Sequence, residues 1–142
     1  MDCLFCKIVA GDVPCEKIGE SKNFFAFLDI SPINKGHTLI VPKSHCKDFS
    51  DFDESLSEEW TVFIKEINEQ VIVGVGAQGS NIGMNNGSAA GQAVFHQHTH
   101  IIPRFEDDEL GSWPNKEMSA DELKEVREQI LKKKEKKAFS DQ

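Results

Sequence analysis

Three histidines stand at alternate positions in one short stretch, His96, His98 and His100, and two isoleucines follow them. Because side chains alternate between the two faces of an extended strand, this spacing predicts that all three imidazoles project from one face. Imidazole has an ordinary pKa near neutrality, so such a row can supply a nucleophile, a proton carrier or metal ligands. The alternatives are a solvent-facing polar strand or an accidental tag-like run, and the internal position disfavours a tag.

A loop with two glycines, residues 85–92, lies just ahead of the histidines. Gly87 and Gly91 permit backbone conformations in which consecutive N–H groups converge on an anion. Taken alone, these residues are also typical of an ordinary hairpin turn. The position of the loop directly before His96 predicts a phosphate site beside the imidazoles.

Two of the four cysteines, Cys3 and Cys6, have the C-x-x-C spacing of a zinc knuckle, whereas Cys15 and Cys46 stand alone. Thiolates at the start of a short helix can converge on one metal ion, which then needs two further ligands. The pattern is not that of a secreted disulfide framework. Two interpretations stay open, a metal site and a pair of reduced thiols.

The composition indicates one small acidic domain. The chain has 142 residues, enough for a single core, and a net charge of −8. This charge repels nucleic-acid backbones, so we expect no nucleic-acid partner, although a small anion can still bind through local chemistry. No apolar run approaches the roughly twenty residues of a membrane span, and the first residues lack signal-peptide features. We therefore expect a cytoplasmic protein without a membrane partner.

Apolar residues at helical spacing predict two helices in the first half of the chain. The first is short and lies before Gly11. The second begins at a capping box formed by Ser55 and Glu58 and ends at Gly74 and Gly76. Its apolar stripe is predicted to face the core and consists of Leu56, Trp60, Phe63, Ile64, Ile67 and Val71.

A third helix is predicted near the C-terminus, where Ser119 and Glu122 form another capping box. The lysine-rich residues 132–137 complement the dipole at its end and fit a solvated helix terminus better than a nucleic-acid patch. Runs of β-branched and aromatic residues predict strands at residues 17–21, 24–28, 38–41, 81–84 and 96–102.

Several motifs, in the right order, resemble the histidine triad (HIT) superfamily. They are NNGSAAGQ at 85–92, HQHTHIIPR at 96–104, DISP at 29–32 and GHTLIVPKSH at 36–45. The resemblance runs from Cys3 to about Arg104 and is closest to the Hint-like, nucleotide-binding branch. It implies an α+β fold with about five mostly antiparallel strands, a long helix and a C-terminal helix, paired as a homodimer. We expect residues 1–110 to form the HIT domain and residues 111–142 a C-terminal segment whose helix packs on or near it.

The resemblance implies catalysis through a covalent nucleotidyl-histidine. His98 matches the middle of the triad, the residue that attacks the α-phosphorus of a nucleotide. His100 and His37 match residues that bind phosphoryl oxygens and orient the nucleophile. These roles agree with imidazole chemistry, because a neutral histidine attacks through one nitrogen while its other N–H is held in place.

The resemblance also implies how a purine nucleotide of the AMP or GMP type binds. Asp29 matches the acidic residue that accepts hydrogen bonds from both ribose hydroxyls, and Ile30 flanks the nucleoside. The remaining implied nucleotide contacts are Asn85, Gly91, Gln92 and Ala93, together with His98 and His100. Ala93 departs from the branch, where a hydroxyl residue often assists the leaving group, so turnover is slower or the leaving group differs.

Two further polar residues, Gln97 and Thr99, also depart from the family, which usually has apolar residues between the histidines. We expect both to face away from the site. Two interpretations of Trp113 stay open: it contributes to the partner's site or covers the base, as C-terminal segments do in relatives, or it is a buried anchor.

A structural zinc ion, one per chain, is also implied by the resemblance. In relatives with zinc, two such cysteines are joined by residues that match His45 and His96, which gives the ligand set Cys3, Cys6, His45 and His96. A closed tetrahedral set of this kind is structural rather than catalytic. Cys46, next to His45, is a competing ligand.

Several functions remain in competition. The leading hypothesis is hydrolysis of purine nucleoside phosphoramidates or related nucleotide conjugates, and a dinucleoside polyphosphate hydrolase fits the triad equally well. A zinc-stabilised nucleotide-binding module with little catalysis is a different class, which Ala93 favours. A metallohydrolase with H-x-H ligands is disfavoured, because no H-x-H-x-D-H pattern follows.

Overall fold

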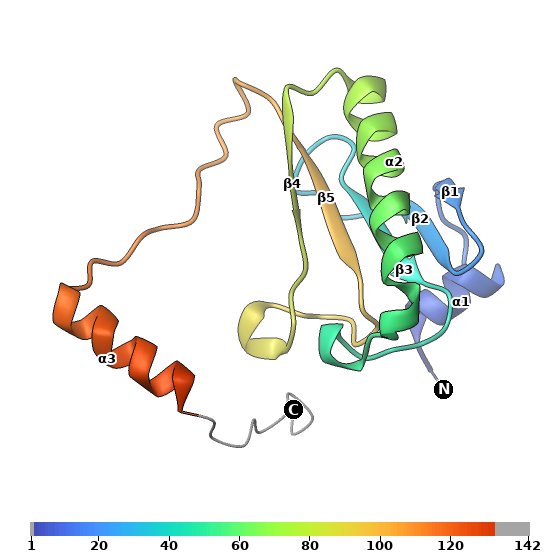
Figure 1. Cartoon of the computed structure of the whole chain (residues 1–142). Helices are drawn as coiled ribbons and strands as arrows, with labels where there is room; N and C mark the ends of the chain where they lie inside the picture. The colour runs from blue at the N-terminus through green and yellow to red at the C-terminus, as the bar shows by residue number, and fades with distance from the viewer. Residues whose placement is uncertain (1, 133–142) are drawn as a thin grey trace.

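The structure, a computed structural model that describes residues 2–132, is an α+β fold built on one five-stranded sheet (Figure 1). Every strand pair is antiparallel, and the order in the sheet is β1-β2-β3-β5-β4. The strands are β1 (Lys17–Glu20), β2 (Phe24–Leu28), β3 (Thr38–Pro42), β4 (Gly79–Gly83) and β5 (Thr99–Arg104). The α-helices are α1 (Leu4–Ala10), α2 (Ser57–Val75) and α3 (Ala120–Leu131). The predicted fold class is confirmed.

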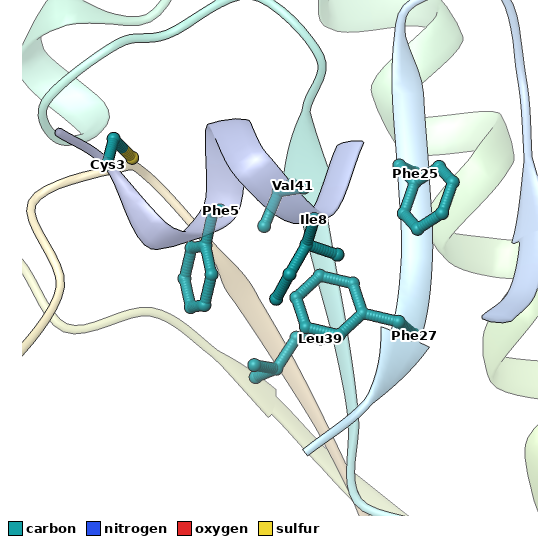
Figure 2. Packing of buried hydrophobic residues seen from close by; sticks show 7 residues of the cluster. All are labelled: Cys3, Phe5, Ile8, Phe25, Phe27, Leu39 and Val41. Carbon is teal, nitrogen blue, oxygen red and sulfur yellow. The ribbon is translucent and has the colours of Figure 1, made fainter. Parts of the chain in front are cut away.

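The sheet is covered by α2 on one face and by the short helix α1 on part of the other. Strand β2 is an apolar run because its side chains alternate between the two faces of the sheet and are buried on both. Phe63, Ile67 and Val71 of α2 pack with Phe24 and Ile101, which confirms the predicted stripe as core. On the opposite face, the buried cluster in Figure 2 comprises Cys3, Phe5, Ile8, Phe25, Phe27, Leu39 and Val41.

The start of α2 differs from the sequence prediction. The helix begins at Ser57, and Ser55 and Glu58 do not form a capping box. Asp53 instead accepts hydrogen bonds from the backbone N and the hydroxyl of Ser55, and it caps a 3-10 turn that precedes the helix. Asp is as good a cap as Ser, and here it comes two residues earlier. At the other end, Gly76 closes α2 with φ 70°, whereas Gly74 lies inside the helix.

The histidine stretch is only partly a strand. Strand β5 begins at Thr99, so His96 and His98 lie in the irregular segment before it. Only Thr38, Leu39 and Ile40 of β3 pair with β5. The segment before β5 is held instead by isolated contacts, such as the hydrogen bond from Gln97 N to Cys46 O at 2.8 Å. The prediction of a continuous strand over residues 96–102 is therefore wrong.

The C-terminal helix α3 stands away from the sheet at the end of an extended segment (Figure 1). The capping box of Ser119 and Glu122 is confirmed. No residue of α3 is buried within the single chain, so its packing on or near the domain and the proposed domain boundary stay predictions. Of the lysine run, residues 133–137 lie outside the described residues. Among the helices that residues 2–132 form, none has the length and apolar character to cross a membrane.

Gly36, just before His37, packs too closely for any side chain. Its φ is +86°, and a Cβ there would lie 3.0 Å from Val75 Cγ1 and 3.2 Å from Pro103 Cγ. We expect Gly36→Ala to lower the free energy of unfolding by roughly 2–3 kcal/mol through backbone strain and overpacking. Gly79→Ala is the control, because no atom lies within 4 Å of its Cβ position. Urea denaturation of both variants measures the effect, and equal losses would contradict the packing argument.

Candidate functional site

His98 is held with one specific nitrogen free to react. Its Nδ1 lies 2.8 Å from the backbone O of His96, and a carbonyl only accepts, so the hydrogen is on Nδ1. Nε2 therefore keeps its lone pair. Phe5 packs edge-on against the ring, with centroids 5.1 Å apart. Burial lowers the pKa of His98, so the ring is neutral at pH 7 and suited to nucleophilic attack.

His37 and His100 form a hydrogen-bonded chain whose direction is fixed by the backbone. The N–H of Ile33 donates to His37 Nδ1 at 3.0 Å, so the hydrogen of His37 is on Nε2. That Nε2–H lies 2.9 Å from His100 Nδ1 and donates to it. The hydrogen of a neutral His100 must then be on its own Nε2.

His100 presents this Nε2–H beside His98, whose ring centroid is 4.9 Å from its own. Nε2 is buried and has no hydrogen-bond partner within the described chain. Burial, together with the neighbouring rings of His98 and His37, lowers the pKa of His100 to about 4. A buried donor without an acceptor costs about 1–3 kcal/mol, so an anionic oxygen placed next to it is stabilised.

Asp29 lies at the edge of the histidine group. Its Oδ1 accepts the N–H of Ser31 at 2.8 Å, and its Oδ2 is 3.7 Å from His37 Nε2. Ile30, next in the chain, is 94% exposed. Asp29, His37 and His100 bring one ligand atom each within 4.8 Å of one another, but a metal there needs a lone pair on His37 Nε2. The Ile33 N–H requires that lone pair on Nδ1, so this group is suited to hydrogen bonding rather than metal binding.

The glycine-bearing loop has the predicted backbone freedom, with φ 83° at Gly87 and 87° at Gly91. The amide of Asn85 lies beside Gly91, 3.7 Å from where a Cβ would be. Gln92 is buried, and both hydrogens of its side-chain amide are used: Nε2 donates to the carbonyls of residues 47 and 94, while Oε1 accepts from Gly87 N. A donor from Gln92 to an anionic ligand must therefore be its backbone N–H, and Ala93 beside it is exposed.

Cys3, Cys6, His45 and His96 form a second cluster, with ligand atoms within 4.8 Å of one another. Cys3 Sγ and Cys6 Sγ lie 3.3 and 3.5 Å from His96 Nδ1, and Cys6 Sγ lies 3.5 Å from His45 Nδ1. A tetrahedral zinc ion with ordinary Zn–S and Zn–N bonds separates sulfur from nitrogen by about 3.5 Å. The four side chains therefore have the spacing of a zinc site.

The position of the ring hydrogen on His96 is also the one that a metal ligand requires. Its Nε2 donates to the backbone O of Pro42 at 2.7 Å, so the lone pair is on Nδ1, which faces both sulfurs. Burial and the neighbouring Cys3 thiol raise the pKa of Cys6, so a cation is needed to favour its thiolate. Cys46, the competing ligand, is not part of this group, and burial raises its pKa to about 11.

Some groups of the site carry no signal in the sequence. They are the Phe5 ring, which packs on His96 and His98, and the backbone groups of Ile33 and Pro42 that orient two histidines. Phe5 reads as an ordinary core residue, and a backbone amide has no residue type to recognise. Gln97 and Thr99 contact each other and are buried, and Thr99 shares a strand face with Ile101, which packs on α2. They face away from the site, as expected.

A cavity of about 670 Å³ lies against β4 and β5 and reaches His100. Ile102, Leu110 and Trp113 contribute to its lining. Trp113 is 91% exposed, so the interpretation as a buried anchor is wrong within one chain.

Known proteins resemble this chain in sequence and in fold. A family model described as HIT domain matches residues 10–107. The adenosine 5′-monophosphoramidase hnt1 of Schizosaccharomyces pombe is 42% identical over 135 residues, which cover 94% of this chain and 98% of that protein. A solved structure of a Streptococcus mutans protein superposes with a TM-score of 0.83 at 41% identity and covers 91% of this chain and 83% of its own. A zinc-bound histidine triad family protein from Mycobacterium smegmatis has a TM-score of 0.73 at 38% identity, with 92% and 96% covered.

Proposed function

This chain belongs to the HIT domain family, and from that membership we propose that it hydrolyses purine nucleoside phosphoramidates or related nucleotide conjugates at the α-phosphate. The observation that carries the proposal is the set of hydrogen-bond partners at His98 and His100, which assigns a lone pair to His98 Nε2 and a hydrogen to His100 Nε2 in two rings whose centroids are 4.9 Å apart. A phosphoryl group needs both, a nucleophile for phosphorus and a donor for its oxygen. The activity named for the S. pombe relative supports the choice of substrate.

In the proposed first step, His98 Nε2 attacks the α-phosphorus and the bond from phosphorus to the leaving nitrogen breaks. The departing amine takes a proton from solvent, since Ala93 has no hydroxyl and is exposed. The nucleotidyl-His98 carries a positive imidazolium, whose Nδ1–H stays bonded to the backbone O of His96. Water then attacks phosphorus and releases one proton to solvent, the bond to Nε2 breaks, and the nucleoside monophosphate is released with neutral His98.

The surrounding residues bind the nucleotide in this proposal. His100 donates to a phosphoryl oxygen, and His37 keeps His100 in the tautomer that donates. Asp29 accepts from the ribose hydroxyls, and Ile30 flanks the nucleoside. The phosphate is further held by Asn85 and by the loop backbone at Gly91 and Ala93.

The cluster of Cys3, Cys6, His45 and His96 is proposed to hold one structural zinc ion, whose charge stabilises the thiolates. Bound there, it would join the start of α1 to the segment that carries His98. The zinc-bound M. smegmatis structure supports this assignment. The expectations of a homodimer and of a cytoplasmic location belong to the same proposal.

The substrate class is tested by comparing adenosine 5′-phosphoramidate with diadenosine tetraphosphate and measuring AMP release. We expect kcat/KM to be at least about tenfold higher for the phosphoramidate, because a chain with net charge −8 repels the polyphosphate. Faster cleavage of the dinucleotide would favour the polyphosphate hydrolase instead. Binding of AMP by calorimetry without hydrolysis of either compound would favour the binding module and overturn the proposal.

A further inference from the structure

The loop that joins β2 to β3 carries Asp29 and His37, and its residues 30–33 have little packing of their own, although Gly36 packs on Val75 and Pro103. Ile30 and Ile33 are 94% and 56% exposed, and residues 31, 32 and 35 are exposed as well. Yet the N–H of Ile33 lies 3.0 Å from His37 Nδ1, the contact that decides which ring nitrogen carries the hydrogen. An exposed loop that fixes a hydrogen in the site needs an anchor.

Asn34 supplies that anchor from the middle of the loop. Its side-chain Nδ2 donates to the backbone O of Pro103 at 3.0 Å and to Asp108 Oδ2 at 3.1 Å. Its own backbone O accepts the N–H of His37 at 3.1 Å. One residue thus connects the turn before His37 to the end of β5.

Asp108, on the other side of this contact, is itself rigidly held. Its side chain is 8% exposed and accepts from Nε and Nη2 of Arg104 at 2.9 and 3.1 Å. The backbone N–H groups of Phe105 and Leu110 donate to the same carboxylate at 2.9 and 3.0 Å. A charged acceptor with this many fixed donors makes a strong and directional partner for the Asn34 amide.

We propose that Asn34 and Asp108 are positioning residues, which hold the turn of residues 33–37 so that His37 keeps its hydrogen on Nε2 and donates to His100. The catalytic consequence rests on the proposed function, but the hydrogen placement does not. Without the Asn34 amide, the Ile33 N–H is free to leave His37 Nδ1, and His37 exchanges between its two neutral tautomers. In the other tautomer His37 accepts at Nε2, and the donor to His100 is lost.

The test uses the full-length protein with ¹⁵N-labelled histidine, in which NMR chemical shifts of the ring nitrogens report the tautomer directly. Asn34→Ala is compared with the unmodified chain, and Asn34→Ser is the second variant if the first does not fold. Gln78→Ala is the matched control, because Gln78 Oε1 also holds the turn after β5, through Glu106 N at 3.2 Å, but the hydrogen bonds of Gln78 go to Gly76, Arg104 and Glu106 rather than to residues 33–37. AMP release from adenosine 5′-phosphoramidate is measured in parallel.

In Asn34→Ala we expect the two His37 nitrogen shifts to move toward each other, as tautomer exchange requires, and those of Gln78→Ala to stay unchanged. We expect kcat to fall about 10- to 100-fold with KM within about threefold, since the effect is on orientation rather than on binding. Unchanged His37 shifts in both Asn34 variants would overturn the proposal, as would equal shifts and losses in Gln78→Ala. Altered shifts in a protein that hydrolyses nothing would uphold the positioning role and reject the proposed function.

Discussion

Replacement of His98 by alanine is expected to lower kcat for phosphoramidate hydrolysis by at least about 10³-fold, because it removes the side chain that attacks phosphorus in the first step of the proposed mechanism. The cost in stability is expected to be small by comparison. The ring loses its hydrogen bond to the His96 carbonyl and its contact with Phe5, which together amount to roughly 1–2 kcal/mol. The protein should therefore fold, and AMP release together with thermal unfolding measures both effects.

Detection of the covalent intermediate tests the role of His98 more directly than the loss of kcat. Acid-free intact-mass analysis after rapid mixing with adenosine 5′-phosphoramidate should show a species heavier by one adenylyl group in the unmodified chain and none in His98→Ala. His100→Gln is an informative companion, because it leaves Nε2 of His98 intact and removes the ring that is proposed to donate to the phosphoryl oxygen. An adenylyl adduct in His98→Ala would assign the nucleophile to another residue.

The elements of this fold follow from local patterns in the sequence to a large extent. The apolar run at 24–28 and the stripe from Leu56 to Val71 each report burial directly, and the structure has β2 and α2 there. The start of α2 was harder to predict because two good caps, Asp53 and Ser55, compete within three residues. Strand β5 begins late although β3 continues to Pro42, because the residues before Thr99 make other contacts, such as Gln97 N with Cys46 O and His96 Nε2 with Pro42 O, which no local pattern records.

The site is predictable in its residue types but not in its hydrogens. Alternate spacing singled out His96, His98 and His100, the C-x-x-C spacing singled out Cys3 and Cys6, and the family resemblance added His45 and His96 to the second cluster. What distinguishes the three histidines is which backbone group each one meets: a carbonyl two residues away for His98, and a carbonyl 54 residues away for His96. Asn34 and Asp108 are separated by 74 residues, and neither stands in a motif. Such contacts exist only once the chain is folded.

The second large effect is expected at His96, where alanine should remove bound zinc and destabilise the fold. His96 is fully buried and lies within 3.5 Å of both thiols, and it is the proposed ligand that comes from the segment before β5. Loss of a structural zinc site costs much of its binding free energy, so we expect a loss of at least about 3 kcal/mol in unfolding free energy. Metal content by mass spectrometry and urea denaturation, each with and without a chelator, measure the effect.

Cys46→Ala is the control for this prediction, because Cys46 is a buried thiol next to His45 that lies outside the ligand cluster. It should retain one zinc ion per chain and lose only the packing of a small side chain, about 1 kcal/mol. If zinc were retained in His96→Ala but lost in Cys46→Ala, the zinc ligand would be Cys46 rather than His96. If His96→Ala and His98→Ala lost stability equally, the division of the histidines into a structural anchor and a nucleophile would be wrong, since only His96 is expected to join α1 to this segment through a metal.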